Sequence, residues 1–284
     1  MKLSITFDRL RWEEKALKEE ADKMGLESEL VDTRQLALNI TRKKLRNGFG
    51  DLVLQRCISH YRSLFLTKIL ENYGVPVINS VDVSEVCGNK LLTSMLLSKA
   101  GVPTPKTYVA LSADCAIPAA ASVGYPLVLK PFVGSWGRNV SIASDEQALA
   151  TIVELRESMQ NPIEHMYYIQ EYVKRPPRDI RVVIAGQDII AAIYRHAPRN
   201  DWRTNVARGA TASSFKPDEE LIEVVQKAAK AVGGGVLGVD AMESEDGYLI
   251  HEVNNTVEFK GAQSVTKARI ARRILKYVVS SVKR

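Results

Sequence analysis

The chain has 284 residues, of which 45% are hydrophobic and 25% are charged, a composition typical of a folded protein with room for two or three domains. No apolar run approaches the ~18 residues of a membrane-spanning helix, and Asp8 and Arg9 interrupt the first strand before a signal-peptide core can form. The net charge of +6 favours an anionic partner. No zinc-finger spacing, aromatic RNA-binding signature or heptad array indicates a nucleic-acid module.

The three cysteines, Cys57, Cys87 and Cys115, are isolated, odd in number and without metal-ligand spacing. We expect them to be small buried hydrophobic residues in a protein of a reducing compartment. The sequence therefore predicts a cytoplasmic protein that binds neither a membrane nor nucleic acid.

Strands and helices alternate in the first 85 residues. Short β-type segments and helical periodicity follow one another at residues 2–7, 11–24, 26–31, 51–57, 61–73 and 75–79. This alternation predicts a small parallel sheet covered by helices. No glycine fingerprint follows the first strand, so this unit is expected to be a platform for a substrate or partner rather than a dinucleotide site.

A helix is expected over residues 83–100, and it carries Lys90. A lysine at such a position is usually only solvated. Next come an apolar strand that ends in Lys130, a loop with Gly134 and Gly137, and a second short strand. The backbone N–H groups of a glycine-containing loop can cradle phosphate oxygens. Because the lysine and the helix of a Walker loop are missing here, a hairpin flap over phosphates fits better.

The strand expected at residues 167–173 runs into Lys174-Arg-Pro-Pro177, a composition typical of a hinge between two domains. Its exposed backbone groups are suited to pair with the edge of an adenine. Beyond the hinge, Asp179 and Arg181 share one face of a strand. Residues 202–210 form a basic, amide-rich segment that favours anion binding.

The segment at residues 236–259 reads as two strands joined by a turn at Glu245-Asp246-Gly247. That turn places Asp240 directly across from Glu252, and Asn254 on the same face of the sheet. Two carboxylates and one amide oxygen make an oxygen-only site that suits Mg²⁺ bridging phosphates. Alone, the pattern is equally typical of an ordinary half-polar hairpin.

Taken in chain order, these motifs resemble the ATP-grasp ligases. Within that superfamily the chain is most similar to the RimK branch, and there to the amino-group carrier protein ligases of lysine and arginine biosynthesis. The stretches that carry the resemblance are Phe7-Asp8-Arg9, Arg11-Trp-Glu-Glu14, Asn79, Val86-Cys-Gly-Asn-Lys90, Lys130-Pro131, Gly134-Ser-Trp-Gly-Arg138, Gln170-Glu171-Tyr172, Arg178-Asp-Ile-Arg181, Asn205 to Gly209, Asp240 and Glu252-Val-Asn-Asn-Thr-Val-Glu-Phe-Lys260.

The resemblance implies an α/β chain with the ATP-grasp fold. It would consist of an N-terminal domain with a small parallel sheet at residues 1–85 and two α+β subdomains, at residues 86–173 and 174–284, that clamp ATP. The implied cofactors are ATP and Mg²⁺, with two metal ions.

The resemblance also implies a role for each site residue. Lys130 and Arg181 would be catalytic, and Asp240, Glu252 and Asn254 would hold Mg²⁺. The residues implied to bind ATP are Lys90, Lys130, Gly134, Ser135, Trp136, Gly137, Arg138, Asn139, Val140, Gln170, Glu171, Tyr172, Val173, Asp179, Arg181 and Asn205. Those implied to line the amino-acid pocket are Arg195, Val206, Ala207, Thr256, Val257, Glu258, Phe259 and Lys260.

The pair Gly261-Ala262 follows this last stretch at the position where the resembled family separates its substrates. Aminoadipate ligases of that family have Asn with Ser or Thr there, and glutamate ligases have Gly-Phe, so this pair matches neither form. A phenylalanine would fill the end of the pocket, whereas Ala262 would leave that volume open. Because one methylene discriminates by only about 1–3 kcal/mol, we expect both acids to be accepted, with α-aminoadipate somewhat preferred.

The implied reaction is an ADP-forming ligation through an acyl phosphate. It joins the α-amino group of α-aminoadipate or glutamate to the C-terminal glutamate of a small, acidic, zinc-containing carrier protein, and the resemblance also implies a homo-oligomer. Three alternatives stay open: a RimK-like glutamate ligase acting on another protein tail, a small-molecule kinase on the same fold, and a nucleic-acid-binding protein.

Overall fold

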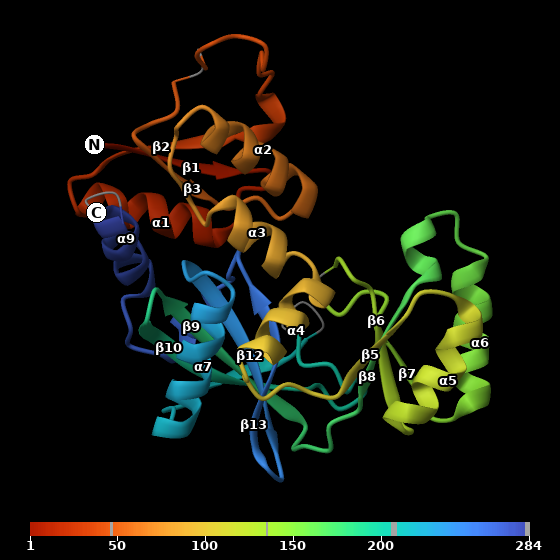
Figure 1. Cartoon of the computed structure of the whole chain (residues 1–284). Coiled ribbons are helices and arrows are strands. Elements are labelled where there is room, and N and C mark those ends of the chain that lie inside the picture. The colour runs from red at the N-terminus through yellow and green to blue at the C-terminus, as the bar shows by residue number, and fades with distance from the viewer. Residues whose placement is uncertain (46–47, 135, 206–208, 282–284) are drawn as a thin grey trace.

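Three separate sheets organise the chain in this computed structural model, which describes residues 1–45, 48–134, 136–205 and 209–281 (Figure 1). A parallel sheet near the N-terminus lies above an antiparallel sheet formed by the C-terminal part of the chain. A second antiparallel sheet, from the middle of the chain, lies to one side (Figure 1).

The N-terminal sheet has the order β2-β1-β3-β4, and all its pairs are parallel. This confirms the predicted parallel sheet. Its strands are β1 (Lys2–Phe7), β2 (Glu27–Asp32), β3 (Leu52–Gln55) and β4 (Val77–Ile78). The helices α1 (Trp12–Lys23) and α2 (His60–Asn72) and the short 3₁₀ helix η1 (Thr33–Gln35) connect them.

The single helix predicted at residues 83–100 is wrong. The structure has two helices, α3 (Val81–Cys87) and α4 (Lys90–Lys99). Asn89 is extended between them, and its side-chain oxygen accepts a hydrogen bond from the Leu91 N–H at 3.0 Å. An asparagine that caps a new helix in this way ends the preceding one. Lys90 therefore stands at the first turn of α4 instead of in the middle of a long helix.

The central sheet is antiparallel and has the order β5-β8-β6-β7. Its strands are β5 (Thr107–Ala110), β6 (Leu127–Lys130), β7 (Ser141–Ala143) and β8 (Tyr167–Glu171), and α5 (Ala113–Val123), α6 (Glu146–Glu157) and the 3₁₀ helix η2 (Pro162–His165) accompany them. The hydrophobic residues of this sheet and of its helices form a cluster of their own. The central sheet thus has its own core.

The C-terminal sheet is antiparallel, with the order β11-β10-β9-β12-β13. Its strands are β9 (Arg178–Ala185), β10 (Asp188–His196), β11 (Thr211–Ser214), β12 (Val236–Ser244) and β13 (Gly247–Asn254). The helices of this part are α7 (Glu219–Ala231), α8 (Lys260–Val265) and α9 (Ile270–Ser281). The hairpin of β12 and β13 was predicted from its turn, and the structure confirms it.

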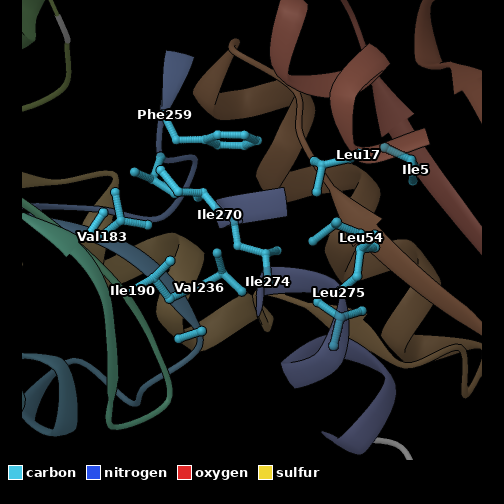
Figure 2. Packing of buried hydrophobic residues seen from close by; sticks show 14 of the residues in the cluster. Ile5, Leu17, Leu54, Val183, Ile190, Val236, Phe259, Ile270, Ile274 and Leu275 are labelled. Carbon is cyan, nitrogen blue, oxygen red and sulfur yellow. The ribbon is translucent and has the colours of Figure 1, made fainter. Parts of the chain in front are cut away.

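The N-terminal and C-terminal sheets share one hydrophobic core. Ile5 and Leu54 come from the N-terminal sheet, Val183 from the C-terminal sheet and Ile274 from α9, and all four belong to one cluster (Figure 2). Burial of such side chains is the main stabilising contribution in a fold of this kind. These two parts are therefore held together firmly, whereas the central sheet packs its core separately.

Two expectations about the environment of the chain can be compared with the fold. Cys57 is buried, but Cys115 is exposed, so the prediction that all three cysteines are buried is wrong for Cys115. Within the described ranges, no helix combines the length and the apolarity that crossing a membrane requires.

Candidate active site

A cavity lies between the central sheet and the C-terminal sheet. It collects most of the residues that the sequence analysis assigned to ATP and metal. The predicted site residues that line it are Lys90, Lys130, Gly134, Trp136, Gly137, Arg138, Val140, Gln170, Glu171, Tyr172, Val173, Asp179, Arg195, Asn205, Asp240 and Glu252. Three further predicted residues, Ser135, Val206 and Ala207, lie outside the described residues.

The hairpin β12–β13 carries the predicted metal ligands. Asp240 pairs directly with Glu252 across the two strands, as predicted, but the turn is one residue shorter than predicted: Ser244 pairs with Gly247, a register that by itself would place Asp240 across from His251. The side-chain nitrogen of Asn254 lies 3.4 Å from Asp240 Oδ2, so all three residues meet at one place. A bulge follows at once, because Asp240 pairs with Glu252 and Ala241 with Ile250. The extra residue of this bulge is His251, which lines the cavity next to Glu252.

A row of alternating charges crosses the C-terminal sheet beside this hairpin. Arg181 lies opposite Asp240 in the register, and its guanidinium donates two hydrogen bonds to that carboxylate. Arg195 lies opposite Asp179 and donates to both of its oxygens, at 2.8 and 2.6 Å, and it reaches Asp240 Oδ2 at 3.1 Å. Burial alone would raise the pKa of Asp179, but Arg195 holds it well below its usual range.

Lys90 connects the hairpin with the loop of the central sheet. Its ammonium lies 3.1 Å from Glu252 Oε1 and donates a hydrogen bond of 2.7 Å to the carbonyl of Gly134. Burial would raise the pKa of Glu252, but the neighbouring cations, Lys90 first among them, lower it to about 2. Glu252 is therefore a carboxylate at neutral pH. The break between α3 and α4 makes these contacts possible, because it places Lys90 at a helix start.

Lys130 stands at the end of β6 and is buried. Its ammonium donates to the side-chain oxygen of Gln170 on β8 at 2.6 Å, and Gln170 in turn donates to Thr107 and Tyr168. Burial lowers the pKa of Lys130 to about 8, with Lys90 and other cations nearby acting in the same direction. A buried ammonium whose nearest acceptor is a neutral amide is suited to receive an anion.

Residues 134–140, in the loop between β6 and β7, were predicted to form a phosphate flap, and the name flap is used for them below. Gly137 has a φ of 65°, and a Cβ added there would lie 2.6 Å from Asn205 Oδ1. Arg203 also donates to the carbonyl of Gly137 at 3.1 Å. The flap therefore meets the segment at residues 201–205 across the cavity, and glycine is required where they touch.

Mg²⁺ fits the residues at this place. Among the described residues no group of three or more His, Cys, Asp or Glu side chains forms a metal cluster. Asp240 and Glu252 supply two carboxylates, and Asn254 supplies an amide. Mg²⁺ is usually held by one or two carboxylates together with substrate phosphates and waters. Asp240 already pairs with Arg181, and Glu252 pairs with Lys90, so both carboxylates attract cations.

Several predicted residues do not line the cavity. Arg181 contacts Asp240 from within the sheet, and Asn139 and Asn254 are likewise absent from the lining. Residues 256–260, predicted for the amino-acid pocket, follow β13 towards the N-terminal sheet. Val257 and Phe259 are fully buried there, and the Glu258 carboxylate accepts a hydrogen bond of 3.0 Å from Arg11.

The argument that Ala262 leaves an open volume in the substrate pocket does not fit the structure. Ala262 lies in α8, is 2% exposed and belongs to the core cluster that the two sheets share. Gly261, its neighbour, is half-buried. A role of this pair in substrate choice stays a prediction, but it would have to act through the position of the preceding loop.

Some lining residues were missed by sequence reasoning. Met242 stands two residues after Asp240 on β12, and this spacing of two could have placed it on the cavity side. Trp202 and Arg203 lie in the segment whose basic character was noticed, although only Asn205, Val206 and Ala207 of that segment were assigned to the site. No local signal in the sequence predicts that His251 lines the cavity, because the bulge brings it there. The same is true of Arg175, whose guanidinium donates, among the described residues, to backbone carbonyls.

A cation-rich cavity between two antiparallel sheets, closed by a glycine flap and bordered by a carboxylate hairpin, defines the ATP-grasp class of ligases. The chain belongs to the RimK-like ATP-grasp family: residues 87–278 match the RimK-like ATP-grasp domain, and residues 3–86 match the LysX preATP-grasp domain. It is therefore an ATP-dependent carboxylate–amine ligase. Members of the class bind ATP and typically Mg²⁺.

Curated relatives are similar to the chain over its whole length. The alpha-aminoadipate–LysW ligase LysX of Sulfurisphaera tokodaii is 39% identical over 288 residues, which cover 100% of both chains. LysX of Saccharolobus solfataricus is 38% identical over 275 residues, 96% of this chain and 99% of that protein. The glutamate–LysW ligase ArgX of Sulfolobus acidocaldarius is 36% identical over 279 residues, 98% of each.

Solved structures agree in fold. A RimK domain ATP-grasp protein from Sphaerobacter thermophilus superposes with a TM-score of 0.80 at 24% identity, over 98% of this chain and all of that one. D-alanine–D-alanine ligase from Bacillus anthracis, solved with ATP, superposes with a TM-score of 0.70 at 16% identity over 100% of this chain and 97% of that one. At these identities the similarity shows the ATP-grasp fold alone.

Proposed function

We propose that this protein attaches α-aminoadipate, and also glutamate, to the C-terminal glutamate of a LysW-type carrier protein, in lysine and arginine biosynthesis. The observation that carries this proposal is the similarity over the whole chain to ligases of both kinds, LysX and ArgX, at 36–39% identity. The cavity supports it, because it holds the groups that an ADP-forming ligation needs.

The nucleotide would occupy the cavity between the two antiparallel sheets. Its phosphates would lie near Lys90 and Lys130, where positive charge meets the flap. The adenine would lie against the segment from Gln170 to Val173, which connects the central sheet to β9. This arrangement agrees with three parts of the chain, at residues 1–85, 86–173 and 174–284, as the working division into domains.

Asp240, Glu252 and Asn254 would hold Mg²⁺, and we propose two ions. Bound Mg²⁺ would neutralise the charge that develops on the transferred γ-phosphoryl group. The protein contributes two carboxylates on adjacent strands, one of them, Glu252, with a pKa of about 2. Glu252 is therefore available as an anion throughout the neutral range.

The reaction would proceed in two steps. The carboxylate oxygen of the carrier's terminal glutamate attacks the γ-phosphorus, the bond to the β-phosphate oxygen breaks, and ADP leaves with an acyl phosphate formed. The α-amino nitrogen of the amino acid then attacks the acyl carbon, loses a proton, and expels phosphate. Lys130 would stabilise the phosphoryl charge, and Arg181 would stabilise the oxyanion that forms during the second step once its guanidinium turns from Asp240 into the cavity.

The flap would protect the acyl phosphate from water. It contacts the segment at residues 201–205 through Gly137, and Lys90 ties Gly134 to Glu252. These contacts span the mouth of the cavity from the central sheet to the C-terminal sheet. Exclusion of water during such a step prevents hydrolysis of the reactive intermediate.

The partner would be a small, acidic, zinc-containing carrier, and we place the reaction in the cytoplasm with a homo-oligomeric enzyme. The formal net charge of +6 suits an acidic partner. If charge steers the encounter, the KM for the carrier should rise steeply with salt, because the Debye length is only about 10 Å at 0.1 M ionic strength. A KM that does not change with salt would show that the net charge has no part in docking.

The direct experiment mixes the purified protein with carrier, ATP, Mg²⁺ and either amino acid. We expect one ADP and one phosphate per amide, and a carrier whose mass increases by one amino-acid residue. AMP and pyrophosphate would contradict the mechanism. A stable phosphorylated product formed without any amine would indicate a kinase. Modification of a different protein tail, with the carrier untouched, would indicate the glutamate ligase reaction instead.

The same assay decides the choice of amino acid. We expect both α-aminoadipate and glutamate to be used, with values of kcat/KM that differ by no more than about 200-fold, since one methylene contributes only about 1–3 kcal/mol. The chain is similar to ligases of both acids, and its pair Gly261-Ala262 matches neither form. Complete rejection of one acid would show that side chains other than this pair enforce the choice.

A further inference from the structure

Asn79, at the end of β4, contacts both ends of the hairpin that carries Asp240 and Glu252. Its amide nitrogen donates to the carbonyl of Val236 at 2.8 Å and to the carbonyl of Asn255 at 2.7 Å. Its amide oxygen accepts from the N–H of Val236 at 2.7 Å. Val236 is the first residue of β12, and Asn255 directly follows β13. One side chain therefore fixes the start of one strand and the end of the other.

The fit around Asn79 is tight. Asn79 is 3% exposed, so its three hydrogen bonds are made away from water, where an unmade bond is costly. Gly235 precedes β12 with a φ of 104°, and a side chain added there would collide with the Asn79 amide. The backbone at residues 235–236 is therefore shaped to receive this asparagine.

The N-terminal part also binds the segment that directly follows the hairpin. Arg56 donates to the carbonyl of Val257 at 2.9 Å, and Glu13 accepts from the N–H groups of Phe259 and Lys260 at 3.2 and 3.1 Å. Val236 and Phe259 also belong to the core that the two sheets share (Figure 2). The base of the hairpin thus packs against the N-terminal part, whereas Asp240 and Glu252 of the same hairpin line the cavity.

The segment from Asn79 to Lys90 reaches the hairpin a second time. It passes through α3 and returns at Lys90, whose ammonium lies 3.1 Å from Glu252 Oε1. Asn79 therefore acts at the base of the hairpin, and Lys90 acts at its carboxylates. Groups that hold metal ligands in place typically change metal affinity 10- to 100-fold when they are removed.

We propose that Asn79 is a positioning residue, which sets the spacing of Asp240 from Glu252 and Asn254 and so the affinity for the metal–nucleotide complex. The hydrogen bonds of Asn79 go to the backbone at Val236 and Asn255 and not to the side chains of Asp240, Glu252 or Asn254, so Asn79 acts through the backbone. This role rests on the proposed function only in that the hairpin holds Mg²⁺ with ATP. The grip on the hairpin itself can be measured without any ligand.

The test compares Asn79→Ala, and the milder Asn79→Ser, with the control Thr33→Val. Thr33 is also buried in the N-terminal part, and its hydroxyl donates to the carbonyl of Phe7 at 3.0 Å, away from the hairpin. Binding of a non-hydrolysable ATP analogue is measured by calorimetry with and without Mg²⁺. Asn79→Ala should lose about tenfold in affinity with Mg²⁺ and less than about twofold without it, because Lys90 and Lys130 remain.

Hydrogen exchange measured by mass spectrometry supplies the second readout. Peptides that cover residues 236–254 should exchange faster in Asn79→Ala than in Thr33→Val, whereas peptides that cover residues 178–196 should not change. If Asn79→Ala does not fold, Asn79→Ser is compared with the same control. Equal loss of melting temperature in both variants, with unchanged metal enhancement and hairpin exchange, would show that Asn79 is merely structural.

Failure of the proposed function would look different. If the unmodified protein shows no metal-dependent binding of the nucleotide, the assignment of the hairpin to Mg²⁺ is wrong. Hydrogen exchange would then still decide whether Asn79 holds the hairpin.

Discussion

The two walls of the cavity handle their charges in opposite ways. On the C-terminal wall the carboxylates of Asp179 and Asp240 are each paired with arginine, and Glu252 is paired with Lys90. On the central wall Lys130 has only the neutral amide of Gln170 as its acceptor. The three carboxylates of the first wall each have a cationic partner, and the Lys130 ammonium of the second has no acid within ion-pair distance in the described structure.

This difference appears in two pKa values. Burial would raise the pKa of Glu252, but Lys90 and its other cationic neighbours lower it to about 2, so this carboxylate stays charged beside its cationic partner. Burial lowers the pKa of Lys130 to about 8, so the opposite wall is close to losing its positive charge. On the C-terminal wall, called the paired wall below, a metal ion can replace a lysine or arginine as the partner of a carboxylate. On the central wall, called the unpaired wall below, the Lys130 ammonium can bind phosphate.

The largest expected effect concerns the paired wall. Asp240→Asn or Glu252→Gln should lower kcat by at least ~10²-fold, the scale of losing one preorganised electrostatic group, while the protein still folds. Steady-state kinetics at saturating ATP and Mg²⁺, together with thermal unfolding, measure both quantities. The loss should be larger in kcat than in the KM for the amino acid.

Glu243→Gln is the matched control for this pair. Glu243 lies on the same strand as Asp240, pairs with Arg178 at 2.8 Å and does not line the cavity. It should keep nearly full activity, because a half-exposed ion pair contributes little. If the two carboxylate variants behave like Glu243→Gln, this hairpin is not the metal site.

The next effect concerns Lys130 and pH. Nucleotide phosphates prefer the charged ammonium, so binding requires Lys130 to be protonated. Below its pKa of about 8 the proton is already present in the free protein, and above it the proton must be taken up. Affinity for the ATP analogue without metal should therefore be constant below pH 8 and fall by about tenfold per unit above it.

Calorimetry at several pH values tests this, and Lys130→Met should remove the dependence. Lys174→Met is the control, because that lysine is fully exposed outside the cavity. It should keep both the affinity and the pH profile of the unmodified protein. A flat profile in the unmodified protein would mean that the unpaired wall stays charged in spite of its burial.

The sequence predicted the paired wall where local rules decide the structure. Although the structure pairs Ser244 with Gly247 and only the bulge at His251 puts Asp240 across from Glu252, the turn was enough to predict the hairpin. The same holds for Asp179 and Arg181, which alternate along one strand and both join the row of charges. Spacing along a strand is enough to predict such faces, because side chains alternate with a period of two.

Other features depend on contacts between distant segments, and no local rule predicts them. The contact of Arg195 on β10 with Asp240, two strands away on β12, and the contact of Asn79 with Val236 become visible only in the folded chain. The break before Lys90 was missed although Asn89 is a good N-cap residue. Ala262 was assigned to a pocket by resemblance, whereas packing of α8 buries it in the core.

The smallest effect concerns His251, the exception on the paired wall. The bulge in β13 turns it into the cavity, and its Nε2 is buried without a hydrogen-bond partner in the described structure. The nearest oxygen of Asp179 is 3.9 Å away, too far for a hydrogen bond. A buried polar atom without a partner destabilises the free protein, so a bound ligand that supplies the partner regains that energy.

His251→Leu should therefore have two opposite consequences. The melting temperature should stay equal or rise, because the unpartnered nitrogen is gone, while affinity for the ATP analogue should fall about two- to tenfold, the value of one hydrogen bond of about 0.5–1.5 kcal/mol. Met242→Leu, which reshapes the same cavity without removing a polar atom, should leave both nearly unchanged. Calorimetry and thermal unfolding on the two variants measure this. If His251→Leu is more stable but binds the analogue as tightly as before, this nitrogen contacts no nucleotide group, and His251 has no role in ligand binding.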